Sequence, residues 1–195
     1  MDQTLELLLS HLDDTRGALW RAVDEVPDSL TGRRPIPDGW SVAEVLEHLG
    51  LLESRVGVLL EKHIAGMTPR TGPAPRFENV DAIFETARVV DRSRRITTGD
   101  ATRPMGKLDV ERARKVLEAS RRKFRDVVQA ANGLPLESVT VPHVAFGPIN
   151  LYQWIAFVGS HEARHAAQIR EVSENLRSAP PPGSALDTAG RSDQA

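Results

Sequence analysis

Residues 157–169 read FVGSHEARHAAQI and lie inside a longer stretch with the pattern of an amphipathic helix. The apolar positions of that stretch recur every three or four residues, which is the spacing of one helix face. These positions are Leu151, Ile155, Val158, His165, Ile169, Val172 and Leu176. The pattern therefore predicts a helix that packs one face into a core and carries two histidines, His161 and His165, on or beside that face.

The same helical spacing of apolar residues recurs in three further segments. They cover about residues 5–26, 42–65 and 109–131. Ser41 and Glu44 have the spacing of a capping box at the start of the second segment. Residues 80–96 fit a shorter helix, and little of the sequence alternates as a half-buried strand does. We therefore predict an all-α fold, a four-helix bundle with at least one long crossover connection and one short extra helix.

The bundle is expected to form one domain over residues 1–178. Residues 179–195 contain three consecutive prolines and lack bulky apolar side chains, so they are predicted to be a disordered tail. Residues 133–148 are predicted to be a long loop in which residues 139–141 are briefly extended.

The composition excludes several classes of function. The 195 residues include 25 basic and 27 acidic side chains, for a net charge of −2 and no dense basic face, so we expect no nucleic-acid partner. There is no cysteine, hence no disulfide, thiolate ligand or cysteine nucleophile. No apolar run approaches the ~20 residues of a membrane helix, and no signal peptide is recognisable, so we expect a cytoplasmic protein without a membrane partner.

Three histidines are the candidate metal ligands. His161 and His165 are four residues apart and project from one helix face, about one turn (~6 Å) from each other. Two imidazoles at this spacing can bind one metal ion. His48, beside the apolar seam of the second segment, completes a three-nitrogen site with an open position if the two helices pack together. Glu44 has two candidate roles, the capping box or orientation of the His48 ring. The alternative for the histidines is burial with hydrogen bonds to carbonyls or carboxylates.

Residues 161–165 also match His-Glu-x-x-His, the zinc-protease signature, in which the glutamate is the general base. The extended form of that signature requires glycine where Gln168 stands and histidine where Glu171 stands. The chain also offers little strand to hold a peptide. A protease is therefore the less favoured interpretation, but Glu162 stays the candidate catalytic base for another hydrolysis.

Three stretches resemble motifs of the DinB-like (YfiT-like) metal-binding four-helix bundles. They are residues 40–49 (WSVAEVLEHL), 146–154 (FGPINLYQW) and 157–169, which occur in the family's order. The resemblance covers about residues 3–177 and implies an up-down-down-up bundle that is frequently a homodimer. It also implies that His48, His161 and His165 hold a divalent ion, nickel or zinc, with water completing the coordination. The family's loop histidine is often followed by proline, whereas Val144 follows His143 here.

The resemblance implies a small-molecule substrate and leaves the reaction open. Characterised relatives include transferases and isomerases that use low-molecular-weight thiols as cosubstrates, and a metal site of this kind can activate either a thiol or water. Arg164 is a candidate for binding the carboxylates of such a thiol, with a surface salt bridge as the alternative. His143 could line a substrate mouth or be exposed, and His11 and His63 are assigned surface or boundary positions. The alternatives are a non-catalytic metal or small-molecule binding bundle, for example in a stress response, and a purely structural dimerising bundle.

Overall fold

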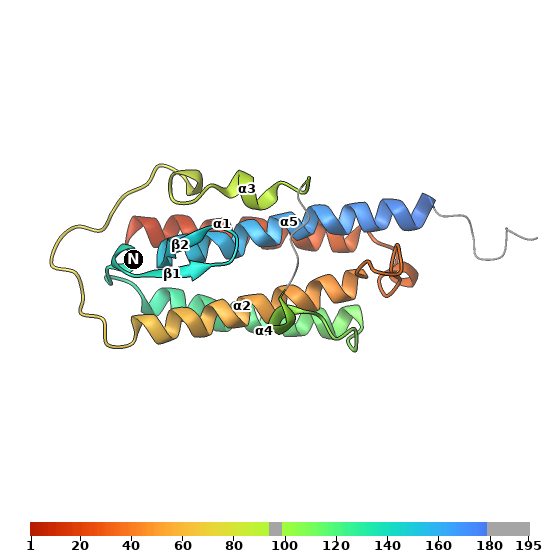
Figure 1. The fold of residues 1–195 in the computed structure, drawn as a ribbon, viewed down its shortest axis with the longest axis horizontal. Helices are drawn as coiled ribbons and strands as arrows, with labels where there is room; N and C mark the ends of the chain where they lie inside the picture. The colour runs from red at the N-terminus through yellow and green to blue at the C-terminus, as the bar shows by residue number, and fades with distance from the viewer. Residues whose placement is uncertain (94–98, 179–195) are drawn as a thin grey trace, which may run out of the picture.

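Four long helices form the body of the computed structural model, which describes residues 1–93 and 99–178 (Figure 1). They are α1 (Gln3–Asp24), α2 (Val42–Ile64), α4 (Val110–Ala130) and α5 (Leu151–Ser178). Each corresponds to one of the segments expected from the apolar spacing, which confirms the predicted all-α bundle. The tail predicted for residues 179–195 lies outside the described residues.

The helices run up, down, down and up (Figure 1). α1 and α5 pack side by side in the same direction, since Arg16 bonds Glu162 and, further along both helices, Arg177 bonds the carbonyl of Glu25. α2 and α4 form the second parallel pair, with the opposite direction. A long crossover over residues 65–109 joins α2 to α4. This topology sets α2 antiparallel to α5, so that the start of α2 faces the later half of α5.

Side-chain caps fix where the long helices begin. Ser41 and Glu44 form the predicted capping box of α2, in which each side chain bonds the backbone N–H of the other residue. Asn150 and Gln153 form the same reciprocal pair at the start of α5, at 2.8 and 3.0 Å. Asp109 caps α4 through the N–H of Arg112. Such a cap stabilises a helix by about 1 kcal/mol.

The crossover contains less helix than expected. In place of one helix over residues 80–96, the structure has a short 3₁₀ turn, η2 (Val80–Ala82), and a five-residue helix, α3 (Thr86–Val90), with residues 94–98 outside the described part. The apolar side chains Ile83, Phe84 and Val89 are buried, and their spacing does not follow one helix face. Three other 3₁₀ turns lie in connections: η1 (Asp28–Leu30), η3 (Asp100–Thr102) and η4 (Leu136–Ser138).

The prediction of a long loop over residues 133–148 was wrong, because the structure has a small β-hairpin there. β1 (Thr140–His143) and β2 (Gly147–Asn150) pair antiparallel, with Thr140 opposite Asn150 and His143 opposite Gly147. Gly147 has φ +70°, a conformation that favours glycine, and it opens β2 after the turn. The indole N–H of Trp154 donates to the carbonyl of Val141 at 3.4 Å, which ties the hairpin to the first turn of α5.

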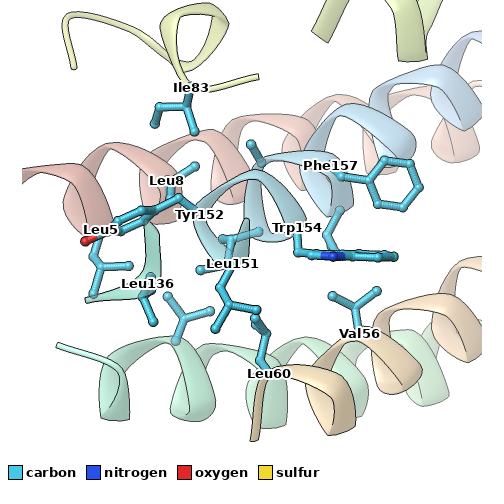
Figure 2. Packing of buried hydrophobic residues seen from close by; sticks show 14 of the residues in the cluster. Leu5, Leu8, Val56, Leu60, Ile83, Leu136, Leu151, Tyr152, Trp154 and Phe157 are labelled. Carbon is cyan, nitrogen blue, oxygen red and sulfur yellow. The ribbon is translucent and has the colours of Figure 1, made fainter. Parts of the chain in front are cut away.

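Two apolar clusters fill the bundle, one toward each end. The first joins the start of α1 to the start of α5 and the end of α2; Figure 2 shows Leu5, Leu60 and Leu151 in it. The second joins the end of α1 to the start of α2 and the end of α5, with Leu19 and Ile169 among its members. Polar side chains occupy the core between the two clusters. None of the helices in the described ranges is long and apolar enough to cross a membrane.

Candidate metal centre

The structure brings His48, His161 and His165 together, as predicted. His48 comes from α2, and the other two come from adjacent turns of the antiparallel α5. One ring nitrogen from each residue lies within 4.8 Å of the others. The ring centroids are 4.9 Å apart for His48 and His165, 5.2 Å for His48 and His161, and 4.5 Å for the two residues of α5. We call this group the histidine cluster.

Two members of the histidine cluster are held by hydrogen bonds at Nδ1. The His48 Nδ1–H donates to the carbonyl of Thr102 in η3 at 2.7 Å, and the His165 Nδ1–H donates to Oε1 of Gln168 at 2.7 Å. A proton on Nδ1 leaves the Nε2 lone pair free, which is the usual arrangement of a histidine that binds metal. Neither partner was predicted from the sequence. The i, i+3 spacing of His165 and Gln168 was a usable signal, whereas Thr102 is 54 residues from His48 along the chain.

Glu44 does not orient the His48 ring. Its carboxylate is engaged by the backbone N–H of Ser41 and by the guanidinium of Arg34. Of the two roles considered for Glu44, the structure therefore supports the capping box.

The geometry of His161 fits a shared cation better than a hydrogen-bonded core. Its Nε2 lies 3.2 Å from Nε2 of His165, and two nitrogens bound to one tetrahedral zinc ion are about 3.3–3.4 Å apart. The Nδ1 of His161 is buried, and no hydrogen-bond partner for it exists among residues 1–93 and 99–178. An unsatisfied buried polar atom costs about 1–3 kcal/mol, so hydrogen bonding alone does not explain the position of this ring. Three imidazoles are a donor set suited to zinc or nickel.

Burial keeps the three rings neutral. It lowers the pKa of His48, and it lowers the pKa values of His161 and His165 well below the ordinary value of 6.5, with the neighbouring histidines acting in the same direction. A neutral imidazole presents a lone pair, whereas a protonated one cannot bind a cation. The histidine cluster is therefore ready for a metal ion at neutral pH.

The histidine cluster lies in the wall of a cavity of about 640 Å³. This volume is in the range of small-molecule sites. The other walls come from the segment before α2, the crossover and the hairpin, and include Trp40, Val89, Arg103 and Phe146. Segments that are far apart in the sequence thus enclose a space beside the candidate ligands.

The structure places Glu162 away from this cavity. Its side chain is 2% exposed, and its carboxylate accepts hydrogen bonds from Arg16 at 2.6 Å, Arg121 at 3.0 Å and Thr15 at 3.2 Å. Successive residues of a helix differ by about 100° in direction, so the side chain after His161 points to another face. This placement argues against the general-base role predicted from His-Glu-x-x-His.

Glu162 belongs to a buried group of four charges that the sequence analysis missed. Arg16, Glu53, Arg121 and Glu162 contribute one residue from each long helix, and all four are buried. Glu53 bonds both arginines and the hydroxyl of Ser120, and Arg121 also donates to the carbonyl of Leu12 at 2.6 Å. We call this group the four-charge network. Its charges sum to zero, and each carboxylate oxygen has a partner.

The remaining candidates fall in three places. Arg164 is buried in the cavity wall, not at the surface, and donates to the carbonyls of Val89, at 3.0 Å, and Asp91. His143 lines the cavity from the hairpin. His11 and His63 are half-buried, and His63 bonds the carbonyl of Leu59 at 2.8 Å, in agreement with boundary positions.

An antiparallel pairing of α2 and α5 that gathers three neutral histidines beside a cavity defines a four-helix bundle with a candidate metal centre. The chain belongs to the DinB superfamily, whose family profile matches residues 11–169. It is 24% identical over 172 residues to the Bacillus subtilis (strain 168) protein YuaE, described as uncharacterized, across 88% of this chain and all of that protein. It also resembles the crystal structure of TT2238, a four-helix bundle protein, with TM-score 0.55, 19% identity and coverage of 86% and 98% of the two chains. That likeness shows the fold.

Proposed function

We propose that this protein binds one divalent metal ion, zinc or nickel, through the Nε2 atoms of His48, His161 and His165, and that it is a metal-dependent enzyme with a small-molecule substrate. One observation carries the proposal: three neutral imidazoles from two antiparallel helices converge in the wall of a cavity of about 640 Å³. With three protein ligands, a tetrahedral ion keeps one position open for a substrate atom.

A bound ion would supply acidification of a coordinated thiol or water, which are the two reactions that we consider. Since the chain has no cysteine, the thiol would come from a low-molecular-weight cosubstrate, and the reaction would be an S-transfer or isomerisation. The alternative is hydrolysis. The carboxylate of Glu162 is paired with two arginines and is therefore a poor general base. This favours the thiol reaction over hydrolysis, because a thiol ionises more readily than water and depends less on a protein base.

Metal analysis of protein purified without a histidine tag tests the binding step. We expect about one ion per chain, and we expect His161→Ala to lose it. The matched control is His63→Ala, which removes a half-buried histidine elsewhere on α2 and should keep the metal. Equal metal in His161→Ala and the unmodified protein would reject this site.

A panel of electrophiles with and without added low-molecular-weight thiols tests the reaction. Turnover that requires both the thiol and the metal supports S-transfer, whereas turnover that needs metal but no thiol identifies a hydrolase. Metal binding without any turnover across the panel would favour the alternative of a non-catalytic binding bundle. A cytoplasmic location and a homodimer are parts of the same proposal, and size-exclusion chromatography with light scattering checks the second.

A further inference from the structure

The hairpin supplies one wall of the cavity that holds the histidine cluster. Four consecutive residues line the cavity there, from His143 at the end of β1 to Phe146 before β2. We call these residues the hairpin wall. Val144, at the turn, is 99% exposed, so the hairpin wall reaches the surface of the protein. A substrate that enters the cavity therefore meets this wall.

Aromatic rings connect His143 to the histidine cluster. The ring of His143 packs against Phe157 at 4.5 Å, Phe146 at 4.9 Å and Trp154 at 5.0 Å between centroids. Phe157 is in turn 5.3 Å from the ring of His161. Figure 2 shows Trp154 and Phe157 projecting from α5 on the same side. An apolar surface with one polar ring in it thus runs from the hairpin toward the candidate metal ligands.

The tautomer of His143 is the opposite of that of its neighbours. The backbone N–H of Ala145 donates to Nδ1 of His143 at 3.1 Å, so Nδ1 bears a lone pair and the neutral ring carries its proton on Nε2. His48 and His165 use Nδ1 as the donor instead. Burial lowers the pKa of His143 from its ordinary value, which favours this neutral form. Within the described residues, no hydrogen bond takes up the Nε2–H.

His143 also does not belong to the metal ligands. The set of nitrogens within 4.8 Å of one another contains only the three residues of the histidine cluster among the described groups. The cavity therefore combines three lone-pair donors at the metal position with one N–H in an aromatic wall. The N–H suits an oxygen acceptor, and the rings suit an apolar or aromatic group.

We propose that His143 binds substrate directly: its Nε2–H donates to an oxygen of a small molecule whose apolar or aromatic part packs on Phe146 and Phe157 while the atoms next to that oxygen reach the metal. This inference rests on the proposed function, because the metal fixes the reacting end of the molecule. The substrate class is a small aromatic or apolar compound with a carbonyl or a similar oxygen beside its reacting atom.

Hydroxamates are suitable probes, since they bind metals through two oxygens and can carry a phenyl or a methyl group. Cobalt-loaded protein is titrated with benzohydroxamate and acetohydroxamate, and the visible absorption of cobalt reports binding. We expect benzohydroxamate to bind about tenfold more tightly, because its ring is buried on the aromatic wall. His143→Phe keeps the ring packing and removes the donor, so it should weaken both probes about threefold to tenfold. His143→Gln, which restores an N–H donor, should recover part of that loss.

The controls separate this inference from the metal site itself. Cobalt uptake should be unchanged in both variants, and His63→Phe should leave the affinities for both probes unchanged. Unaltered hydroxamate affinity in His143→Phe, or equal affinity for the two hydroxamates, would overturn the inference while leaving the metal site intact. Failure of the unmodified protein to take up cobalt would overturn the proposed function and this inference with it.

A second measurement needs neither metal nor a variant. Long-range ¹⁵N–¹H NMR of the histidine rings distinguishes the two tautomers in the metal-free protein. We expect a proton on Nε2 for His143 and on Nδ1 for His48 and His165. A proton on Nδ1 of His143 would remove the donor and overturn the inference even if the variants failed to fold.

Discussion

The core of this bundle contains two polar groups that differ in how completely they are satisfied. In the four-charge network, every carboxylate oxygen accepts a hydrogen bond and opposite charges are equal in number. In the histidine cluster, two Nε2 atoms face each other at 3.2 Å and the buried Nδ1 of His161 has no partner within the described ranges. A closed network needs nothing further, whereas the histidine cluster has unused lone pairs beside a cavity. Unsatisfied nitrogens beside a cavity, more than polarity, are what distinguish the histidine cluster as the candidate metal site.

The two groups lie close together on the same helices. Glu162 follows His161 directly on α5, and Glu53 is five residues after His48 on α2. Leu52 lines both the large cavity and a small void of about 10 Å³ beside the four-charge network. The four-charge network and the histidine cluster are separate in hydrogen bonding, and we expect them to be separate in function as well.

The largest effect on stability is expected from removing one charge of the four-charge network. Glu162→Ala leaves two buried guanidinium groups short of a partner and should lower the free energy of unfolding by about 3–5 kcal/mol, measured by urea denaturation. Glu118→Ala is the matched control, since that 38%-exposed carboxylate bonds the same Arg16 at the edge and should cost at most about 1 kcal/mol. Equal losses in the two variants would contradict the distinction between buried and peripheral charges.

Metal removal should lower the thermal stability that a metal ion at the histidine cluster provides. With free zinc at one hundred times its dissociation constant, binding should stabilise the protein by about 2.7 kcal/mol relative to the chelated form, seen as a higher melting temperature. The shift should vanish in His165→Ala and persist in His11→Ala. A melting temperature that does not respond to zinc in the unmodified protein would leave the unsatisfied nitrogens without an explanation.

The partner of His165 should matter for metal affinity but little for the fold. Gln168→Ala removes the acceptor that sets the His165 tautomer and should weaken metal binding about tenfold to a hundredfold. Competition with a coloured chelator measures this change. The stability of the metal-free variant should stay within about 0.5 kcal/mol of the original, because Gln168 is half-buried. A large loss of stability in the metal-free form would instead assign Gln168 a structural role.

The smallest effect is a pH dependence of the metal-free protein. The folded-state pKa of His161 is depressed, so the unfolded chain binds more protons below about pH 6.5 and stability falls as the pH drops from there through the folded pKa. One such histidine contributes a loss of about 1.4 kcal/mol per pH unit in that range. Urea midpoints at pH 7.5 and 5.5 should therefore converge in His161→Gln relative to the unmodified protein. If the urea midpoint changed with pH equally in His161→Gln and in the unmodified protein, the ring of His161 would not be buried in its neutral form.

Local sequence signals were sufficient for the long helices and for the pairing of His161 with His165. Apolar spacing and the capping box of Ser41 and Glu44 depend on near neighbours, and they gave the start of α2 at the correct residue. Spacing alone made His48 a ligand only on the condition that α2 packs against α5, and the shared site of the three histidines was implied by the resemblance to the DinB-like family. The hairpin escaped prediction because each strand has four residues and the facing Pro142 and Pro148 weaken any strand pattern.

The four-charge network left a signal that was not used. Each of its residues follows a buried apolar residue by four positions and therefore lies on the same inward helix face. The pairs are Leu12 and Arg16, Leu49 and Glu53, Leu117 and Arg121, and Val158 and Glu162. One such charge is unremarkable, but one on every long helix with a net sum of zero indicates a common buried layer. The choice of partners within the layer depends on the topology and could not be derived from spacing.

The four-charge network has a consequence for how accurately the bundle is assembled. Because each long helix donates one charge at the same height, sliding a single helix by one turn, about 5.4 Å, would separate its charge from the other three. The four-charge network thus favours one relative position of α2 and α5 along the bundle axis. His48 lies five residues before Glu53, and His161 directly precedes Glu162, so an offset held by the four-charge network also keeps these two histidines at the same height in the bundle.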